Sequence, residues 1–219
     1  LPKKARALDT SGNNNHGQIY SGRALEFDGV TDKLTATTDV DTIMPHMIVS
    51  GTFTVACWVK LTSLKDSTVW YASYTDGDSR VGLNTGDSGE LGFSTYSAAG
   101  AGWAYLSNIT PALSVGVWYR AVCVLDSGST KFYINGVERT ETTQVSDTKL
   151  FSPTHDAFMI GERNSVYFDG AISDFQSWNT AWTAADVTYD YLNPESLALN
   201  AGGTALTESN LKLWYPMQD

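Results

Sequence analysis

The chain has 219 residues, a length that one large β-sandwich domain can reach without dividing. Twenty-four acidic residues against fourteen basic ones give a net charge of −10, and the only basic cluster is the short Lys3-Lys4-Ala5-Arg6. This balance argues against nucleic acid and anionic membranes as partners, because both require basic charge. No apolar run is long enough to insert into a membrane. Cations, neutral glycans and proteins remain.

The first informative segment is a loop, Asp9-Thr-Ser-Gly-Asn-Asn-Asn-His-Gly17, which precedes the strand segment Ala24-Leu-Glu-Phe-Asp-Gly29. Asn, Asp and Gly tolerate left-handed backbone conformations and cap their own turns, so we expect a rigid loop rich in oxygen atoms. The residues leave two interpretations open. The loop is a tight connection whose side chains satisfy backbone groups, or it holds a hard cation.

Strand patterns follow along most of the chain. In residues 53–61, Phe53, Val55 and every second residue after them share one face, which predicts a half-buried strand. The pair Asn135-Gly136 predicts a hairpin with a type I′ turn inside residues 131–139. Further strands are expected over 16–20, 33–37, 67–74, 80–83, 90–96, 103–107, 117–125, 157–161 and 171–178. Many short antiparallel strands predict an all-β sandwich or barrel.

The end of the chain differs from this pattern. A short helix is expected over Thr183–Leu192, with Thr183 as N-cap, Asp186 three residues on and Pro194 beyond the end. Residues 193–210 are polar and Gly-rich and read as a linker-like loop. An apolar strand at 211–219 ends the chain. We expect one domain over residues 1–219.

The two cysteines, Cys57 and Cys123, lie within apolar strand segments. The sequence leaves open whether they form a disulfide or are two small buried thiols, and we favour the thiols.

Aromatic residues crowd the middle of the chain, where polar residues are interleaved with them. Sugar rings present apolar C–H faces and hydroxyl edges, so aromatic and polar side chains together are typical of a glycan site. The same segments alternate as strands do, so about half of these aromatics belong to the core. The residues that border turn signals are the candidate ligand-binding residues: Tyr74, Asp76, Arg80 and Trp103. We assign Trp58, Trp118 and Trp178 to the core or to sheet packing.

Residues that would indicate catalysis are missing from the sequence pattern. No strand carries the alternating carboxylates typical of a glycoside hydrolase, and neither a nucleophile elbow nor a zinc-spaced His/Cys cluster occurs. We therefore name no catalytic residue and expect no enzyme.

The order of these segments resembles the laminin G-like, concanavalin A-like lectin/glucanase jelly-roll domain of the bacterial and phage type. The resemblance covers roughly residues 7–192. It implies two antiparallel sheets packed face to face, frequently a calcium ion at the sandwich edge, and ligand recognition by variable loops. Carried onto this sequence, it implies a structural Ca²⁺ held by the following residues: Asp9, Asn13, Asn15, Asp28 and Asp174. The segments that carry it are 9–17, 24–29, 53–61, 116–126, 131–137 and 168–179.

One departure from the family concerns its first strand. That strand normally precedes the Asp9–Gly17 loop, but its equivalent here is Leu-Lys-Leu-Trp-Tyr-Pro-Met-Gln-Asp at 211–219. The strand either completes its own sandwich, which we favour, or opens the next repeat of a longer protein.

The resemblance and the composition together predict a non-catalytic recognition module, stabilised by calcium, that binds a carbohydrate or a cell-surface protein. We expect it outside the cell or on a virion surface, as in adhesion domains of phage virion proteins or secreted bacterial proteins. The alternative is a structural virion component, a fibre or capsid decoration domain, that works through self-association or contacts with coat proteins. A homo-oligomer or a tandem repeat would suit either function.

Overall fold

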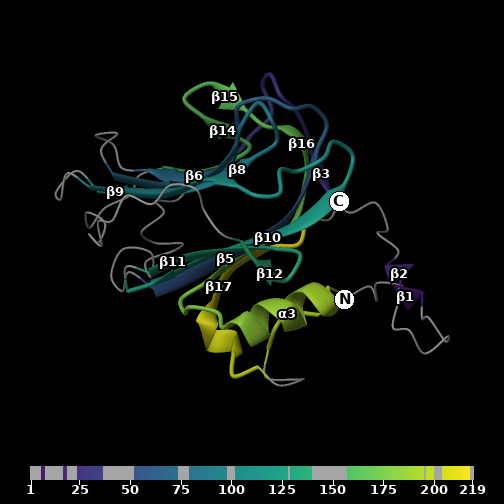
Figure 1. Cartoon of the computed structure of the whole chain (residues 1–219), viewed down its shortest axis with the longest axis vertical. Coiled ribbons are helices and arrows are strands. Elements are labelled where there is room, and N and C mark those ends of the chain that lie inside the picture. The colour runs from purple at the N-terminus through teal and green to yellow at the C-terminus, as the bar shows by residue number, and fades with distance from the viewer. Residues whose placement is uncertain are drawn as a thin grey trace.

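The computed structural model describes residues 6–7, 17–18, 24–36, 52–73, 79–97, 102–127, 129–139, 157–194, 196–199 and 204–217. Two antiparallel sheets pack face to face, and one α-helix lies beneath the lower sheet (Figure 1). This confirms the predicted concanavalin A-like sandwich with one short helix. No helix in the described part of the chain is long and apolar enough to cross a membrane.

The lower sheet has seven strands and the upper sheet six. The lower sheet runs in the order β12-β11-β10-β5-β16-β17, and β3 also pairs with β16. Its strands are β3 (Leu25–Asp28), β5 (Thr52–Leu61), β10 (Trp118–Asp126), β11 (Ser129–Ile134), β12 (Val137–Glu138), β16 (Asp169–Trp178) and β17 (Leu211–Tyr215). The order in the upper sheet is β4-β13-β6-β7-β8-β9. Its strands are β4 (Leu34–Thr35), β13 (Ala157–Ile160), β6 (Ser67–Ser73), β7 (Ser79–Thr85), β8 (Leu91–Ser97) and β9 (Gly102–Ile109).

Two further pairs of short strands complete the fold. One joins β1 (Arg6–Ala7) to β2 (Gly17–Gln18), and the other joins β14 (Glu162–Arg163) to β15 (Val166–Tyr167). The predicted hairpin at Asn135-Gly136 is confirmed, because both residues have positive φ angles, 53° and 80°, between the paired Ile134 and Val137.

The main core lies between the sheets and follows the alternation of the strands. The face of β5 that begins with Phe53 and Val55 points into it, as the sequence predicts. The expectation that β5 is only half buried was wrong. Thr54, Ala56 and Trp58 on its other face are 5% exposed or less, because a second apolar layer covers the lower sheet.

This second layer is built by helix α3 (Ala184–Leu192) and the segments on either side of it. The helix begins as predicted at the N-cap Thr183, whose side chain accepts a hydrogen bond from Asp186 N, while the Asp186 side chain bonds back to Thr183 N. Its Val187 packs in a cluster with Trp178 and Trp182. The segment 193–210, expected to be linker-like, adds the buried Ala198 and Leu206 to that cluster and contains a short 3₁₀ helix, η2 (Glu208–Asn210).

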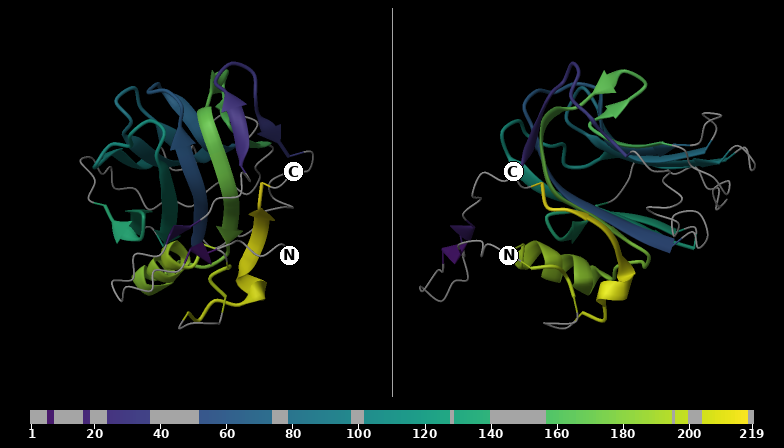
Figure 2. Two further views of the ribbon diagram at one scale, coloured as in Figure 1. Left: turned by 90° about the vertical axis from the view of Figure 1, so that its right-hand side faces the viewer. Right: turned by 180° about the vertical axis from the view of Figure 1, so that it is seen from behind.

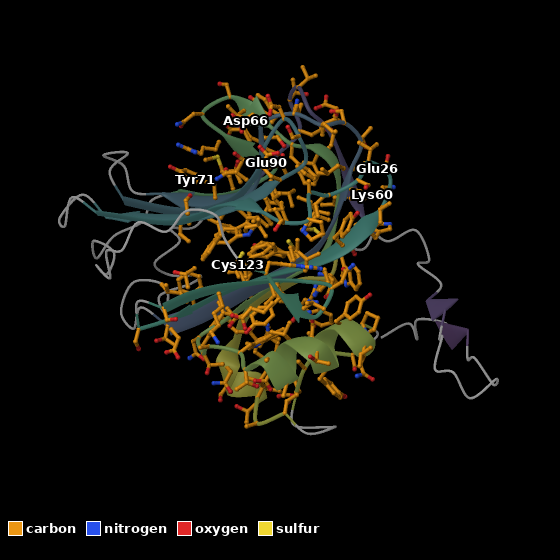
Figure 3. All side chains as sticks on the ribbon, viewed as in Figure 1. Glu26, Lys60, Asp66, Tyr71, Glu90 and Cys123 are labelled. Atoms are coloured by element: carbon orange, nitrogen blue, oxygen red, sulfur yellow. The ribbon has the colours of Figure 1, made fainter. Side chains whose placement is uncertain are left out.

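The two cysteines are free and fully buried in the main core. The prediction of buried thiols is confirmed. Burial raises the pKa of Cys57 to about 12, so the unreactive thiol form persists at neutral pH. Figure 3 shows Cys123 between the two sheets.

The C-terminal strand docks on its own sandwich. β17 pairs with β16 along Phe175–Trp178, and β3 pairs with the same edge of β16 along Asp169–Ile172. The two strands therefore lie end to end beside β16 (Figure 2). Of the two arrangements that the sequence left open, this chain adopts closure onto the same sheet.

Candidate functional site

The outer face of the upper sheet, called the open face below, is the candidate site, because none of the helices that the structure describes lies on it. Both helices that the structure describes, α3 and η2, lie at the lower sheet (Figure 1). In the upper sheet, Val81, Leu83 and Phe93 point into the core. The residues between them consequently belong to the outer face.

The strand register places aromatic, small and polar residues in rows across this outer face. Each row crosses β6, β7, β8 and β9 in turn. One row contains Tyr71, Gly82, Ser94 and Tyr105, and the next contains Ser73, Arg80, Tyr96 and Trp103. Three aromatic positions, Tyr96, Trp103 and Tyr105, thus adjoin on two neighbouring strands.

Tyr71 forms the floor of the first row and requires glycine beside it. The Tyr71 side chain is 5% exposed and lies on the upper sheet (Figure 3). A Cβ atom at Gly82 would stand 3.1 Å from Tyr71 Cδ2 and 2.8 Å from the Trp70 carbonyl oxygen. Glycine therefore lets the tyrosine ring lie against strand β7 instead of projecting from the sheet.

Arg163 lies over that floor. Its guanidinium carbon is 5.2 Å from the centroid of the Tyr71 ring, within the range of a cation–π contact. The β14–β15 hairpin, which packs against β6, supplies this arginine. We did not predict this hairpin, because two-residue strands carry no recognisable alternation. The only available signal was Asn164-Ser165, the two turn residues with positive φ.

Local hydrogen bonds hold the hairpin in shape. The Glu162 carboxylate accepts a bond of 2.7 Å from Ser165 N across the turn, and its other oxygen is 3.4 Å from Lys33 Nζ. Glu162 is 5% exposed and is paired in this way, so its charge is already compensated on the side away from Arg163.

The predicted ligand residues are only partly placed. Arg80 and Trp103 lie in the same row of the open face, separated by Tyr96 on the strand between them. Tyr74 and Asp76 lie outside the described residues. Tyr71, Gly82 and Arg163 belong to this face and were not among the predicted ligand residues. Trp58 and Trp178 are buried at the lower sheet, as assigned, and Trp118 is half-buried there beneath Lys60.

The predicted calcium ligands are not brought together within the described part of the chain. Asp9, Asn13 and Asn15 lie outside it. Asp28 stands opposite Asp169 in the sheet, whereas Asp174 is five residues further along β16, a separation of roughly 15 Å at the usual rise per strand residue. No cluster of three metal-binding side chains occurs among the residues described.

The carboxylate of Asp28 is occupied by its own turn. One oxygen accepts hydrogen bonds from the backbone N–H groups of Val30, Thr31 and Asp32, at 2.8 to 3.0 Å, and the other accepts one from the Thr31 hydroxyl. The backbone N–H of Thr31, followed by those of Val30 and Asp32, holds the pKa of Asp28 well below its ordinary value.

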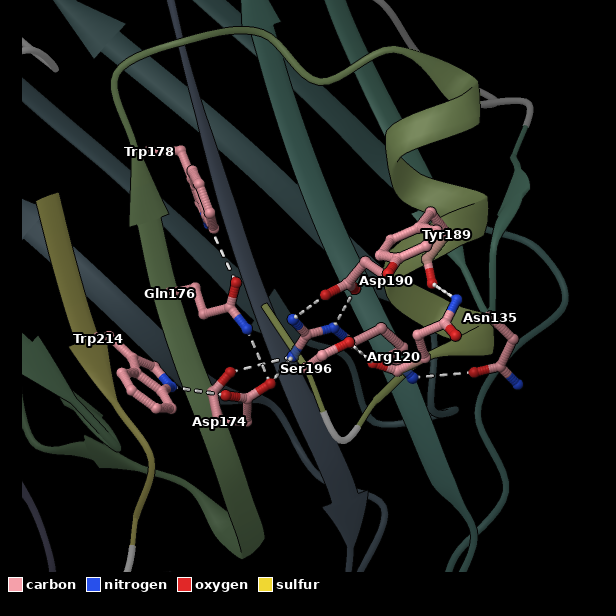
Figure 4. A network of polar contacts seen from close by, with 10 residues as sticks. Arg120, Asn135, Asp174, Gln176, Trp178, Tyr189, Asp190, Ser196 and Trp214 are labelled. Carbon is pink, nitrogen blue, oxygen red and sulfur yellow. Dashed lines mark hydrogen bonds and ion pairs between the residues drawn. The ribbon is translucent and has the colours of Figure 1, made fainter. Parts of the chain in front are cut away.

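Asp174 belongs to a buried network of charges (Figure 4). Its carboxylate accepts bonds of 2.8 Å from Trp214 Nε1 and Gln176 Nε2 and lies 3.2 Å from the Arg120 guanidinium. Arg120 also forms a two-pronged pair with Asp190 of α3, at 2.7 and 2.9 Å. Burial opposes the charge of Arg120, but the two carboxylates outweigh it and keep its pKa above the ordinary value. The neighbours of Asp28 and Asp174 therefore do not fit a single calcium ion.

Comparison with known proteins identifies the family of this sandwich. The family model described as the concanavalin A-like lectin/glucanases superfamily matches residues 28–188, more than half of the chain. The chain belongs to this superfamily. No curated protein sequence matches it.

Solved structures of the same fold include lectin-like and carbohydrate-binding domains. The heptameric SAP-like pentraxin of Limulus polyphemus is 16% identical, with a TM-score of 0.57 over 76% of this chain and 80% of that one. Domain 4 of AbnA, an arabinanase of Geobacillus stearothermophilus, in complex with arabinotriose, is 22% identical, with a TM-score of 0.58 over 80% and 78%. The CBM40 of the Ruminococcus gnavus IT-sialidase, bound to α2,3-sialyllactose, is 15% identical, with a TM-score of 0.59 over 76% and 95%. At these identities the superfamily fold is what they share.

Proposed function

We propose that this protein is a non-catalytic glycan-binding module, and that the open face of the upper sheet holds the sugar. The observation that carries the proposal is the pair of rows on that face, where Tyr96, Trp103 and Tyr105 adjoin beside the small residues Gly82 and Ser94. Aromatic faces stack on the C–H faces of sugar rings, and small residues leave room for a ring to approach.

The covering of the two sheets supports the same conclusion. α3 and the segment after it bury the lower sheet, whose Arg120 is paired both with Asp174 of the same sheet and with Asp190 of α3. That side of the sandwich serves stability. In the described part of the chain, the upper sheet alone presents a broad face without a helix.

The setting in which the module works belongs to the proposal as well. We place it outside the cell or on a virion surface as an adhesion module. Its structural neighbours include a domain of an extracellular arabinanase in complex with arabinotriose and a sialidase CBM40 bound to sialyllactose. A calcium ion on the Asp9–Asn15 loop stays a proposal supported by the sequence. If calcium is bound there, EDTA should lower the melting temperature, because an ion that binds only the native state stabilises that state by mass action.

Binding to a glycan array, followed by calorimetry on the strongest binder, tests the function. Trp103→Ala is expected to weaken binding by about tenfold or more, since stacking and burial of one aromatic ring contribute at least about 1.5 kcal/mol. Trp118→Ala is the matched control, because Trp118 is a half-buried tryptophan of the lower sheet and its loss should leave affinity unchanged. Absence of glycan binding by a stable oligomer in solution would instead favour the structural virion component.

A further inference from the structure

We propose that the ligand of the open face is an acidic glycan, a sugar chain that carries carboxylates such as those of uronic or sialic acids, and that Arg163 binds a carboxylate of it. The inference rests on the proposed function, because it names the class of sugar for the same face. Three observations carry it: the distribution of charge between the sheets, the surroundings of Arg163, and the position of Arg80.

The strands of the upper sheet contain no carboxylate at all. None of the residues of β4, β13, β6, β7, β8 and β9 is Asp or Glu, although the chain carries 24 acidic residues. The strands of the lower sheet hold six acidic residues: Glu26, Asp28, Asp126, Glu138, Asp169 and Asp174. In a molecule of net charge −10, strands free of carboxylates lower the repulsion that an anionic ligand on this sheet would meet.

Arg163 brings a positive charge that the described residues do not neutralise. None of the ion pairs among them includes Arg163, and its Nε atom is buried without a hydrogen-bond partner. Glu162, its neighbour in sequence, is already paired with Lys33. Arg120 on the lower sheet shows the opposite situation, since two carboxylates compensate it. Within the described part of the chain, Arg163 therefore has no ionic partner, and its charge can serve an external acceptor.

The Tyr71 ring holds Arg163 in place on the open face. The guanidinium carbon lies 5.2 Å from the ring centroid, within the range of a cation–π contact, above the first row of the face. A guanidinium binds a carboxylate with two parallel hydrogen bonds. Because the arginine is already positioned by the tyrosine, less conformational freedom is lost when a ligand binds.

Arg80 adds a second positive position on the same face. It is the only charged residue in the six strands, and the register sets it between Ser73 and Tyr96. Tyr96 and Trp103 continue that row, so one cationic position is followed by two aromatic positions along the face. This arrangement suits a chain of sugar rings with repeated carboxylates better than a single free anion, because the aromatic positions need ring faces to stack on.

The test compares an acidic oligosaccharide with its uncharged form. Wild-type protein is titrated with trigalacturonate and α2,3-sialyllactose, and with the methyl esters of both, which keep the shape of the sugar and remove the charge. We expect the esters to bind at least about tenfold more weakly, since charge-assisted hydrogen bonds are lost. The dissociation constants of the acids should also rise about threefold or more as salt is raised from 50 to 300 mM, because salt screens the charges.

Variants of Arg163 assign the preference to this residue. Arg163→Met should abolish the difference between acid and ester, whereas Arg163→Lys should keep part of it, and melting temperatures show whether both variants are folded. The protein could instead bind neutral glycans, with binding weakened by Trp103→Ala but not by Arg163→Met. That result would overturn the inference and leave the proposed function standing. Absence of binding to every glycan on the array would overturn both. Acid-selective binding that Arg163→Met leaves intact would also overturn the assignment to this face.

Discussion

Arg120 is a full charge buried on the outer face of β10, where α3 covers it. Its exposed fraction is 0%, and its two-pronged pair with Asp190 ties the helix to the sheet. Asp190→Asn should lower the free energy of unfolding by about 3 kcal/mol, because it leaves a buried guanidinium with one carboxylate in place of two. Urea unfolding measures this change.

An exposed ion pair provides the control for this variant. Lys131 and Glu138 are 3.8 Å apart, and the exposed fractions of their side chains are 49% and 51%. Lys131→Met should change the free energy of unfolding by less than about 1 kcal/mol, because water screens the pair. Equal losses in the two variants would show that the Arg120 network does not hold α3 in place.

Asp28 makes stability depend on pH. Its pKa is below the ordinary value of 3.8 in the folded chain, since backbone N–H groups bind its ionised form. The ionised carboxylate therefore stabilises the fold above pH 3.8, and this stabilisation is lost as the pH falls from there toward the folded pKa. The melting temperature of Asp28→Ala should differ most from that of the wild type at pH 7, and the difference should narrow by pH 2.5. A difference that does not change with pH would contradict this role.

Among the elements of the fold, strand β17 closes the edge of the lower sheet. It pairs with β16, places Trp214 Nε1 2.8 Å from Asp174, and leads to Met217, which is 6% exposed in the core. In a chain that ends at Asn210, the free energy of unfolding should fall by about 4 kcal/mol and the melting temperature by about 10 °C, because apolar burial and hydrogen bonds are lost. A synthetic peptide of residues 211–219 should restore part of this loss. An unchanged melting curve would mean that β17 does not stabilise this sandwich.

The sequence predicted the elements with strong patterns and missed what depends on distant segments. The alternation of β5, the Asn135-Gly136 turn and the capped helix after Thr183 are local signals, and all three are confirmed. The burial of the second face of β5 depends on α3, more than 120 residues away, and no local pattern encodes it. The short β14–β15 hairpin gave no alternation, so Arg163 was missed. The family resemblance implied a metal at Asp174, and no local pattern showed its buried partner Arg120, which lies on another strand.

At the scale of the whole molecule, the two sheets have different roles. The lower sheet is covered by α3, and its buried Arg120 and Asp174 are paired. The upper sheet presents aromatic positions, Gly82 and Arg80 without a carboxylate in its strands, and Arg163 of the β14–β15 hairpin lies over it. This division is the reason why we propose the upper face as the binding surface and the lower sheet as its support. The cysteines between the sheets are free and buried, so a reducing environment should leave the fold intact.

The claim that the open upper face is the glycan site is tested most directly by NMR. Amide chemical shifts are mapped during titration with the oligosaccharide that binds most strongly on the array. We predict that the largest shifts fall on β6, β7, β8 and β9 and on the β14–β15 hairpin around Arg163, while β5, β10 and α3 stay unchanged. Shifts confined to the lower sheet, to α3 or to the edge where β3 meets β17 would contradict the assignment of the open upper face as the glycan site.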